Sequence, residues 1–201
     1  MSAIFQNILL CSSIFPALIL AFRWQCALSS WFKVLVVVRC VADLSCLYFK
    51  IEFGNVFPVF HVSVLLETVC IILLFKDSLR LSNILGSFLL LVVFCFALIE
   101  MNLGIWRNNY WTTLIAYGIV ILLSVAALLK GGGTDKKYSL IFFALLIFHA
   151  SNFIYVLFED VIRENALLFS SLQPLIIGLI VFLNIAFCKA ILETEKASSR
   201  Q

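Results

Sequence analysis

The chain has 201 residues, of which 64% are hydrophobic and 12% are charged, and its formal net charge is +3. Its mean hydropathy is +1.13. A water-soluble domain could not bury this much apolar surface, so the composition excludes a soluble globular protein and predicts that the lipid bilayer is its solvent. We therefore expect bilayer contact and no nucleic-acid partner.

Seven apolar segments are long enough to cross a membrane, which takes about 20 residues at roughly 1.5 Å per residue. The sequence predicts an all-α, polytopic membrane protein with one domain of seven transmembrane helices, followed by a cytoplasmic polar tail at 189–201. Arg39 and Asp43 interrupt the second segment and make it the weakest. The helices are expected at about 2–22, 31–49, 57–75, 81–99, 110–129, 138–158 and 166–188.

Positive charges alternate between the gaps that separate these segments. The first, third and fifth gaps and the tail hold or adjoin ten of the fourteen Lys and Arg residues: Arg23, Lys33, Lys76, Arg80, Lys130, Lys136, Lys137, Lys189, Lys196 and Arg200. The other gaps hold one each, Lys50, Arg107 and Arg163. Cytoplasmic loops retain excess Lys and Arg, so this pattern predicts an outside N-terminus and a cytoplasmic C-terminus. The chain has no Asn-x-Ser/Thr sequon, which fits a multi-pass protein of a bacterial inner membrane.

Four polar residues lie near the middle of predicted helices, where an ionisable side chain costs a few kcal/mol and needs a partner or a use. Asp43 is in the second helix, Glu67 in the third, and His149 and Asn152 in the sixth. If these three helices share a core, the four groups meet at one depth. They are the candidate ligand-binding or proton-binding residues.

Each candidate also has a structural interpretation. Arg39 lies four residues before Asp43 on the same helical face, so the two could form an intrahelical ion pair near the cytoplasmic boundary; alternatively, Asp43 pairs with His149 or a ligand. Glu67 has no basic residue one turn away on its own helix, so it needs a partner on a neighbouring helix or takes up a proton. His149 and Asn152 could serve ordinary hydrogen-bonded helix packing.

No catalytic constellation is visible in the sequence. The chain has two histidines and neither an HExxH nor a Cys-x-x-Cys motif, so a zinc hydrolase lacks its ligands. Asp43 is the only aspartate at depth, which excludes a di-aspartate intramembrane protease. We expect a protein that is not an enzyme and that has no catalytic residues, metal site or cofactor.

Two regions resemble a known family. In helices two and three that family has an acidic residue, then an Asn in the outer loop, then an early polar residue and a later Glu; the residues in this chain that resemble them are, in order, Asp43, Asn55, His61 and Glu67. The segment 149–155 resembles the family's Ser-Gly-Asn stretch and departs from it with Ala150 at the glycine position. The family comprises small seven-helix inner-membrane proteins common in Bacteroidota. The resemblance covers about half of the chain and implies a sensory membrane module found near histidine kinases.

Three functions from different classes remain open. The first is a receptor-like sensor or signalling module that acts through a protein partner in the membrane or cytoplasm. The second is a structural or accessory subunit of a larger membrane complex, which the small size and short loops favour. The third is a small proton-coupled transporter, although no internal repeat is evident.

Overall fold

The computed structural model describes residues 3–26, 28–105, 109–130 and 136–198, without the side chains of 3–7, 9–10, 136–137, 163 and 194–198. Every regular element within these ranges is a helix, as the sequence predicts. The helices are α1 (Ala3–Phe22), α2 (Ser30–Phe53), α3 (Phe57–Leu79), α4 (Asn83–Gly104), α5 (Tyr110–Leu129), α6 (Lys136–Leu157), α7 (Glu159–Glu164) and α8 (Ala166–Ser198).

Each of the seven predicted segments corresponds to one of the long helices, and five of these are long and apolar enough to cross a membrane: α3, α4, α5, α6 and α8. In α1 the described apolar stretch is the shorter Cys11–Phe22. Helix α2 is not among these five, because charged side chains such as Arg39 and Asp43 lower its hydropathy.

Other parts of the structure depart from the predicted boundaries. The short helix α7 was not expected, and α8 continues to Ser198, so its backbone is helical through most of the predicted tail. Residues 131–135 of the fifth predicted gap, together with Arg107 and Arg200, lie outside the described residues.

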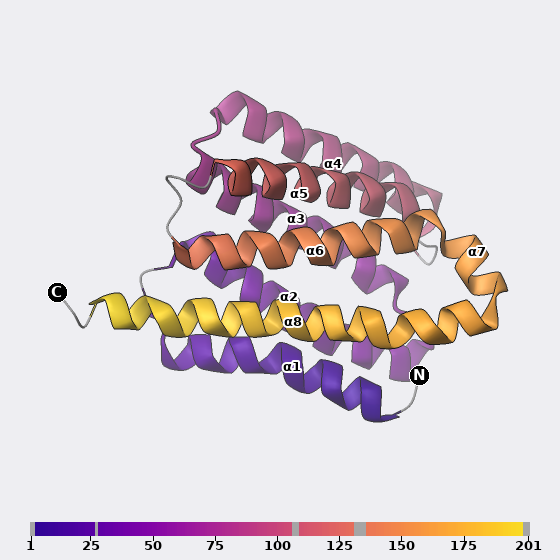
Figure 1. Ribbon diagram of the computed structural model, residues 1–201. Helices are drawn as coiled ribbons and strands as arrows, with labels where there is room; N and C mark the ends of the chain where they lie inside the picture. The colour runs from indigo at the N-terminus through magenta and orange to yellow at the C-terminus, as the bar shows by residue number, and fades with distance from the viewer. Residues whose placement is uncertain (1–2, 27, 106–108, 131–135, 199–201) are drawn as a thin grey trace.

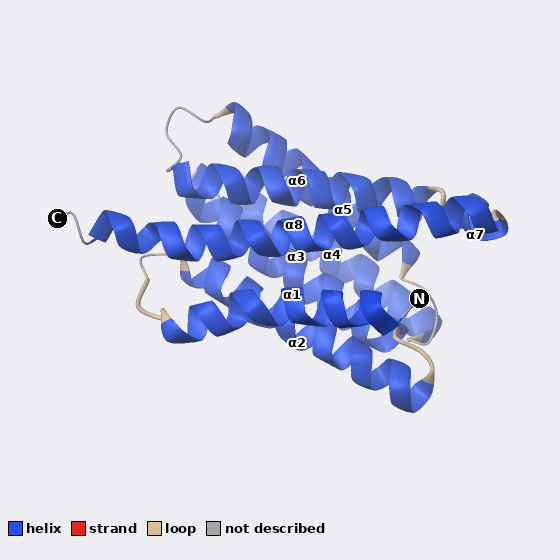
Figure 2. Ribbon diagram, turned by 60° about the horizontal axis from the view of Figure 1, so that its bottom comes forward, coloured by secondary structure: helices blue, strands red, loops and turns tan. Residues whose placement is uncertain are grey.

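Six helices form a closed ring in the order α1, α2, α3, α5, α6, α8, because each packs against the next and α8 packs against α1. Helix α4 lies outside this ring against α3 and α5 (Figure 1). Successive long helices reverse direction, so the α2–α3 turn, the start of α5 and helix α7 lie at the same end as the start of α1. The end of α8 lies at the opposite end (Figures 1 and 2).

Local interactions explain where several helices begin and end. The Ser82 hydroxyl accepts a hydrogen bond from the backbone N–H of Leu85 and caps the start of α4. Gly54 ends α2 in the left-handed conformation, with φ 65°, which glycine adopts without steric cost. Such caps satisfy the hydrogen-bonding groups at helix ends, which the hydrocarbon of a bilayer could not satisfy.

The start of α5 is capped by a neighbouring helix. The Glu100 side chain of α4 accepts hydrogen bonds from the backbone N–H groups of Trp111 at 2.6 Å and Thr112 at 2.9 Å. Glu100 is only 6% exposed. The carboxylate therefore both satisfies orphan donors and complements the positive end of the α5 dipole.

Aromatic side chains fill the half of the ring that is remote from α7. Phe75 of α3 stacks on Phe142 of α6 with ring centroids 4.6 Å apart, and Phe32 of α2 meets Phe187 of α8 edge to face at 5.2 Å. All four rings are fully buried. This packed region leaves the polar groups closer to the α7 end.

Candidate functional site

A buried ion pair joins α2 and α3. Arg39 Nη1 lies 3.2 Å from Glu67 Oε2, and the two side chains are 8% and 20% exposed. Of the two carboxylates within reach of α2, the one that Arg39 pairs with in the described residues is Glu67 and not Asp43. Arg39 turns toward α3 because Glu67 offers a carboxylate inside the ring, whereas snorkelling would leave that carboxylate without a partner. Glu67 thus receives its partner from a neighbouring helix.

The Arg39 guanidinium is also held by an aromatic ring. Its Cζ lies 4.8 Å from the ring centroid of Phe148 on α6, a distance at which a cation is attracted to the aromatic face. The Arg39 side chain therefore connects three helices, α2, α3 and α6. Its Nε is buried and has no hydrogen-bond partner among the described residues.

His149 lies next to this pair and is 2% exposed. Its Nδ1 is 2.8 Å from the carbonyl oxygen of Leu145. Because a carbonyl only accepts, Nδ1 carries the hydrogen in this bond, and in the neutral ring Nε2 is the acceptor. The His149 ring also meets Tyr117 of α5 edge to face, with centroids 5.1 Å apart. Phe148, Arg39 and Glu67 continue the chain of contacts from His149 to α3.

Asp43 lies one turn beyond Arg39 on α2. It is close enough to Glu67 for the two like charges to interact. Its Oδ2 is buried without a hydrogen-bond partner in the described part of the chain. Two carboxyl groups and one guanidinium therefore lie in one neighbourhood of α2 and α3.

Asn152 belongs to a cavity of about 290 Å³ at the α7 end of the bundle. Its amide donates to the Phe148 carbonyl oxygen at 2.8 Å, one turn back on α6. The cavity wall consists of Phe57, Phe60, Val64, Asn109, Thr113, Tyr117, Asn152, Tyr155, Val156 and Glu159. Tyr117 is the link between the cavity and the buried charges, because it lines the cavity and contacts His149.

The structure therefore brings Glu67, Asp43 and His149 into one neighbourhood and places Asn152 on an adjoining cavity. Sequence reasoning missed Tyr117 as the connecting residue, and it missed Glu100. Thr113 and Tyr117 lie one turn apart on α5, so a polar stripe was visible. Glu100 gave no comparable signal, because its partners are backbone groups that every residue carries.

The arrangement is suited to polar recognition. The cavity offers amide, hydroxyl and carboxylate groups to a ligand. Because Tyr117 contacts His149, a movement of the Tyr117 ring would change the packing beside the Arg39–Glu67 ion pair. Among the described residues no three His, Cys, Asp or Glu side chains are grouped as metal ligands. Comparison of the chain with protein-family models, curated proteins and solved structures gave no match.

Proposed function

We propose that this protein spans a bacterial inner membrane seven times, with its N-terminus outside and its C-terminus in the cytoplasm. The alternation of Lys and Arg between gaps supports this orientation. The opposite placement of the start of α1 and the end of α8 is what an odd number of spans requires (Figure 1). In this orientation the 290 Å³ cavity lies at the outer side.

Within this topology we propose a receptor-like sensor that binds a small polar molecule in the outer cavity. One observation carries the proposal: Tyr117 lines the cavity and also contacts His149, which is 2% exposed. A ligand that moves the Tyr117 ring would disturb the packing around His149 and Phe148. Because Phe148 holds the Arg39 guanidinium, the disturbance would reach the ion pair between α2 and α3.

The output would be a change in how α2 and α3 lie relative to α5 and α6. Packed helices respond to such a disturbance by small shifts between discrete arrangements. At the cytoplasmic side the described chain offers short turns and the end of α8, so the signal would need a protein partner there. A kinase of the membrane or cytoplasm would fit this requirement, as the family resemblance implies.

Ligand-dependent stabilisation of the purified full-length chain tests the sensor proposal. Thermal unfolding is followed in mild detergent with a panel of amino acids, sugars, polyamines and nucleosides, since a molecule that binds only the folded state raises the Tm. We expect at least one compound to stabilise the wild-type chain, and Asn152→Leu to abolish the effect. Asn102→Leu is the matched control, because Asn102 is exposed on α4. A panel without a stabiliser, or a stabilisation that survives in Asn152→Leu, contradicts the proposal.

An accessory subunit is the second candidate, and the outer position of α4 favours it. This helix packs against α3 and α5 and leaves large apolar side chains exposed, including Phe88, Leu91 and Phe94. Such a face suits a neighbouring transmembrane helix as well as lipid. Native mass spectrometry after mild extraction separates the candidates: a stoichiometric partner that is lost in Leu91→Arg but retained in Asn152→Leu supports a subunit.

A further inference from the structure

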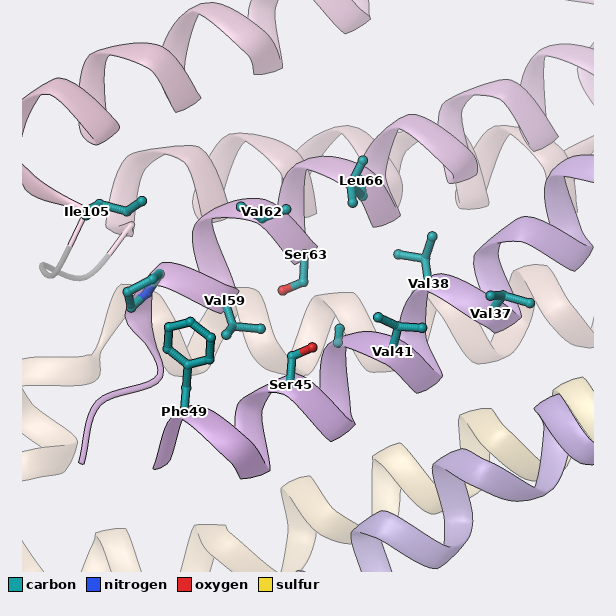
Figure 3. Close-up of a pocket in the computed structure, with 12 residues that line it drawn as sticks. Val37, Val38, Val41, Ser45, Phe49, Val59, Val62, Ser63, Leu66 and Ile105 are labelled. Atoms are coloured by element: carbon teal, nitrogen blue, oxygen red, sulfur yellow. The ribbon is translucent and has the colours of Figure 1, made fainter. Parts of the chain in front are cut away.

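A second cavity, separate from the polar one, runs along the seam between α2 and α3. It has a volume of about 440 Å³. Figure 3 shows aliphatic side chains of both helices facing one another across it, with the Ser45 and Ser63 hydroxyls between them. The groove is lined by Val37, Val38, Val41, Ala42, Ser45, Phe49, Pro58, Val59, Val62, Ser63, Leu66 and Ile105, none of which carries a charge.

The rim of this groove faces outward from the bundle. Val37, Val41, Val62 and Leu66 are 40%, 56%, 45% and 45% exposed. In a protein surrounded by lipid, exposed aliphatic side chains in the middle of helices face hydrocarbon. The groove therefore opens sideways into the bilayer, in contrast to the polar cavity at the end of the bundle.

The floor of the groove offers few polar groups that could bind a polar molecule. Val59 is 9% exposed and Ser63 7% exposed. The Ser63 hydroxyl donates to the Phe60 carbonyl oxygen at 3.4 Å, so it already has an acceptor within its own helix. Water would find few partners here, and a cavity holds water only where several polar groups surround it. An apolar chain is the occupant that this lining fits.

The extent of the groove matches one leaflet. From Val37 to Phe49 the α2 axis advances about 18 Å at 1.5 Å per residue, compared with about 15 Å for half of the hydrocarbon core. Phe49, Pro58 and Ile105 mark the end near the α2–α3 turn, and Val37 and Leu66 mark the end near the middle of the helices. A straight chain lying along the seam would therefore run from the membrane boundary to the midplane.

We propose that this groove binds one acyl chain of a phospholipid from the leaflet that adjoins the α2–α3 turn. The site is independent of the sensor proposal and requires only that α2 and α3 lie in the membrane. Val38 and Leu66 directly precede Arg39 and Glu67 in the sequence, so the bound chain lies beside the seam that the ion pair holds together. Filling the groove supplies the van der Waals contacts that an empty space would lack.

Photo-crosslinking tests the site directly. The full-length protein is placed in phosphatidylcholine nanodiscs in which a small fraction of the lipid carries a diazirine within the acyl chain. After illumination, labelled residues are located by mass spectrometry. We expect Val59 and Ser63, on the buried floor, to be labelled more strongly than Leu91, which is 58% exposed on the outer face of α4.

Three substitutions sharpen the result. Ala42→Phe fills the groove from α2, and Val41→Phe covers its mouth from an exposed position, so that one variant avoids the packed interior. Both should reduce floor labelling at least several-fold, whereas Leu91→Phe should leave it unchanged. Thermal unfolding establishes that each variant is folded. Labelling restricted to exposed positions, or floor labelling that persists in Val41→Phe, overturns the proposal.

Discussion

Removing the carboxylate of Glu67 should destabilise the protein more than its position in an apolar helix suggests. In Glu67→Leu the Arg39 guanidinium keeps its charge while its side chain remains 8% exposed. Breaking a buried ion pair by removing one partner costs about 3–5 kcal/mol. Phe148 still attracts the guanidinium, and Asp43 lies one turn away as a second carboxylate, so we expect a loss of about 3 kcal/mol, at the lower end of this range.

Replacing both partners should recover most of that loss. In Arg39→Met/Glu67→Leu no charge is left without its partner, and apolar residues of similar size often replace a buried pair at little cost. We expect the double variant to lie within about 1 kcal/mol of the wild type, which requires strong coupling between the two sites. In contrast, adding Asp43→Asn to Glu67→Leu removes the second carboxylate and should lower stability further.

Equilibrium unfolding of the purified protein in mixed micelles measures these differences. The matched control is Glu193→Leu, because Glu193 pairs with Lys189 at 3.7 Å on an exposed part of α8, with side chains 49% and 57% exposed. Exposed pairs of this kind contribute at most about 0.5 kcal/mol. If Glu67→Leu costs no more than the control, or if the Arg39 and Glu67 losses simply add, the buried ion pair does not hold α2 and α3 as described.

Three further predictions concern the fold. Glu100→Ala should cost about 2–4 kcal/mol of unfolding free energy, because it leaves the part-buried N–H of Trp111 and the buried N–H of Thr112 without a charged acceptor. Glu100→Gln should cost less, and equal losses in equilibrium unfolding would contradict the capping role. Gly54→Ala should lower the unfolding free energy by about 1 kcal/mol because φ is 65°, whereas Gly178→Ala in the interior of α8 should raise it by a similar amount. Neither added Cβ would meet an atom within 4 Å, so the difference comes from backbone conformation alone, and thermal unfolding should show Tm shifts of opposite sign. Asn184→Leu removes hydrogen bonds from α8 to Ser12 and Ser13 of α1, at 3.2 and 3.4 Å, and should cost about 0.6 kcal/mol, with Asn102→Leu as the neutral control.

The helices could be predicted from the sequence because long apolar runs and helix formation are local properties. The turn at Gly54 follows from a single glycine that lies at the end of α2. Helix α7 was missed because Glu159–Glu164 is too short and too polar to show an apolar period. The ring order and the outer position of α4 depend on which helical faces fit together, and no local pattern contains that information.

The candidate site could be predicted in part for the same reason. Glu67 and His149 stand out because ionisable residues are rare at membrane depth. Their relation to Arg39 could not be predicted, since the nearer carboxylate along the chain is Asp43, and the choice between the two depends on how α3 packs against α2. Tyr117 acquires its role only from the cavity on one side and His149 on the other.

In the proposed topology the polar cavity is open to the outside of the cell and reaches Asn152 beside the buried charges. Asn152→Cys in a chain whose seven native cysteines have been replaced tests this with a membrane-impermeant thiol reagent added to intact cells. Ser139→Cys, near the other end of α6, is the matched position. We predict that Cys at 152 reacts from outside and that Cys at 139 reacts only after the membrane is permeabilised. Protection at 152 together with external reaction at 139 would contradict both the orientation and the cavity.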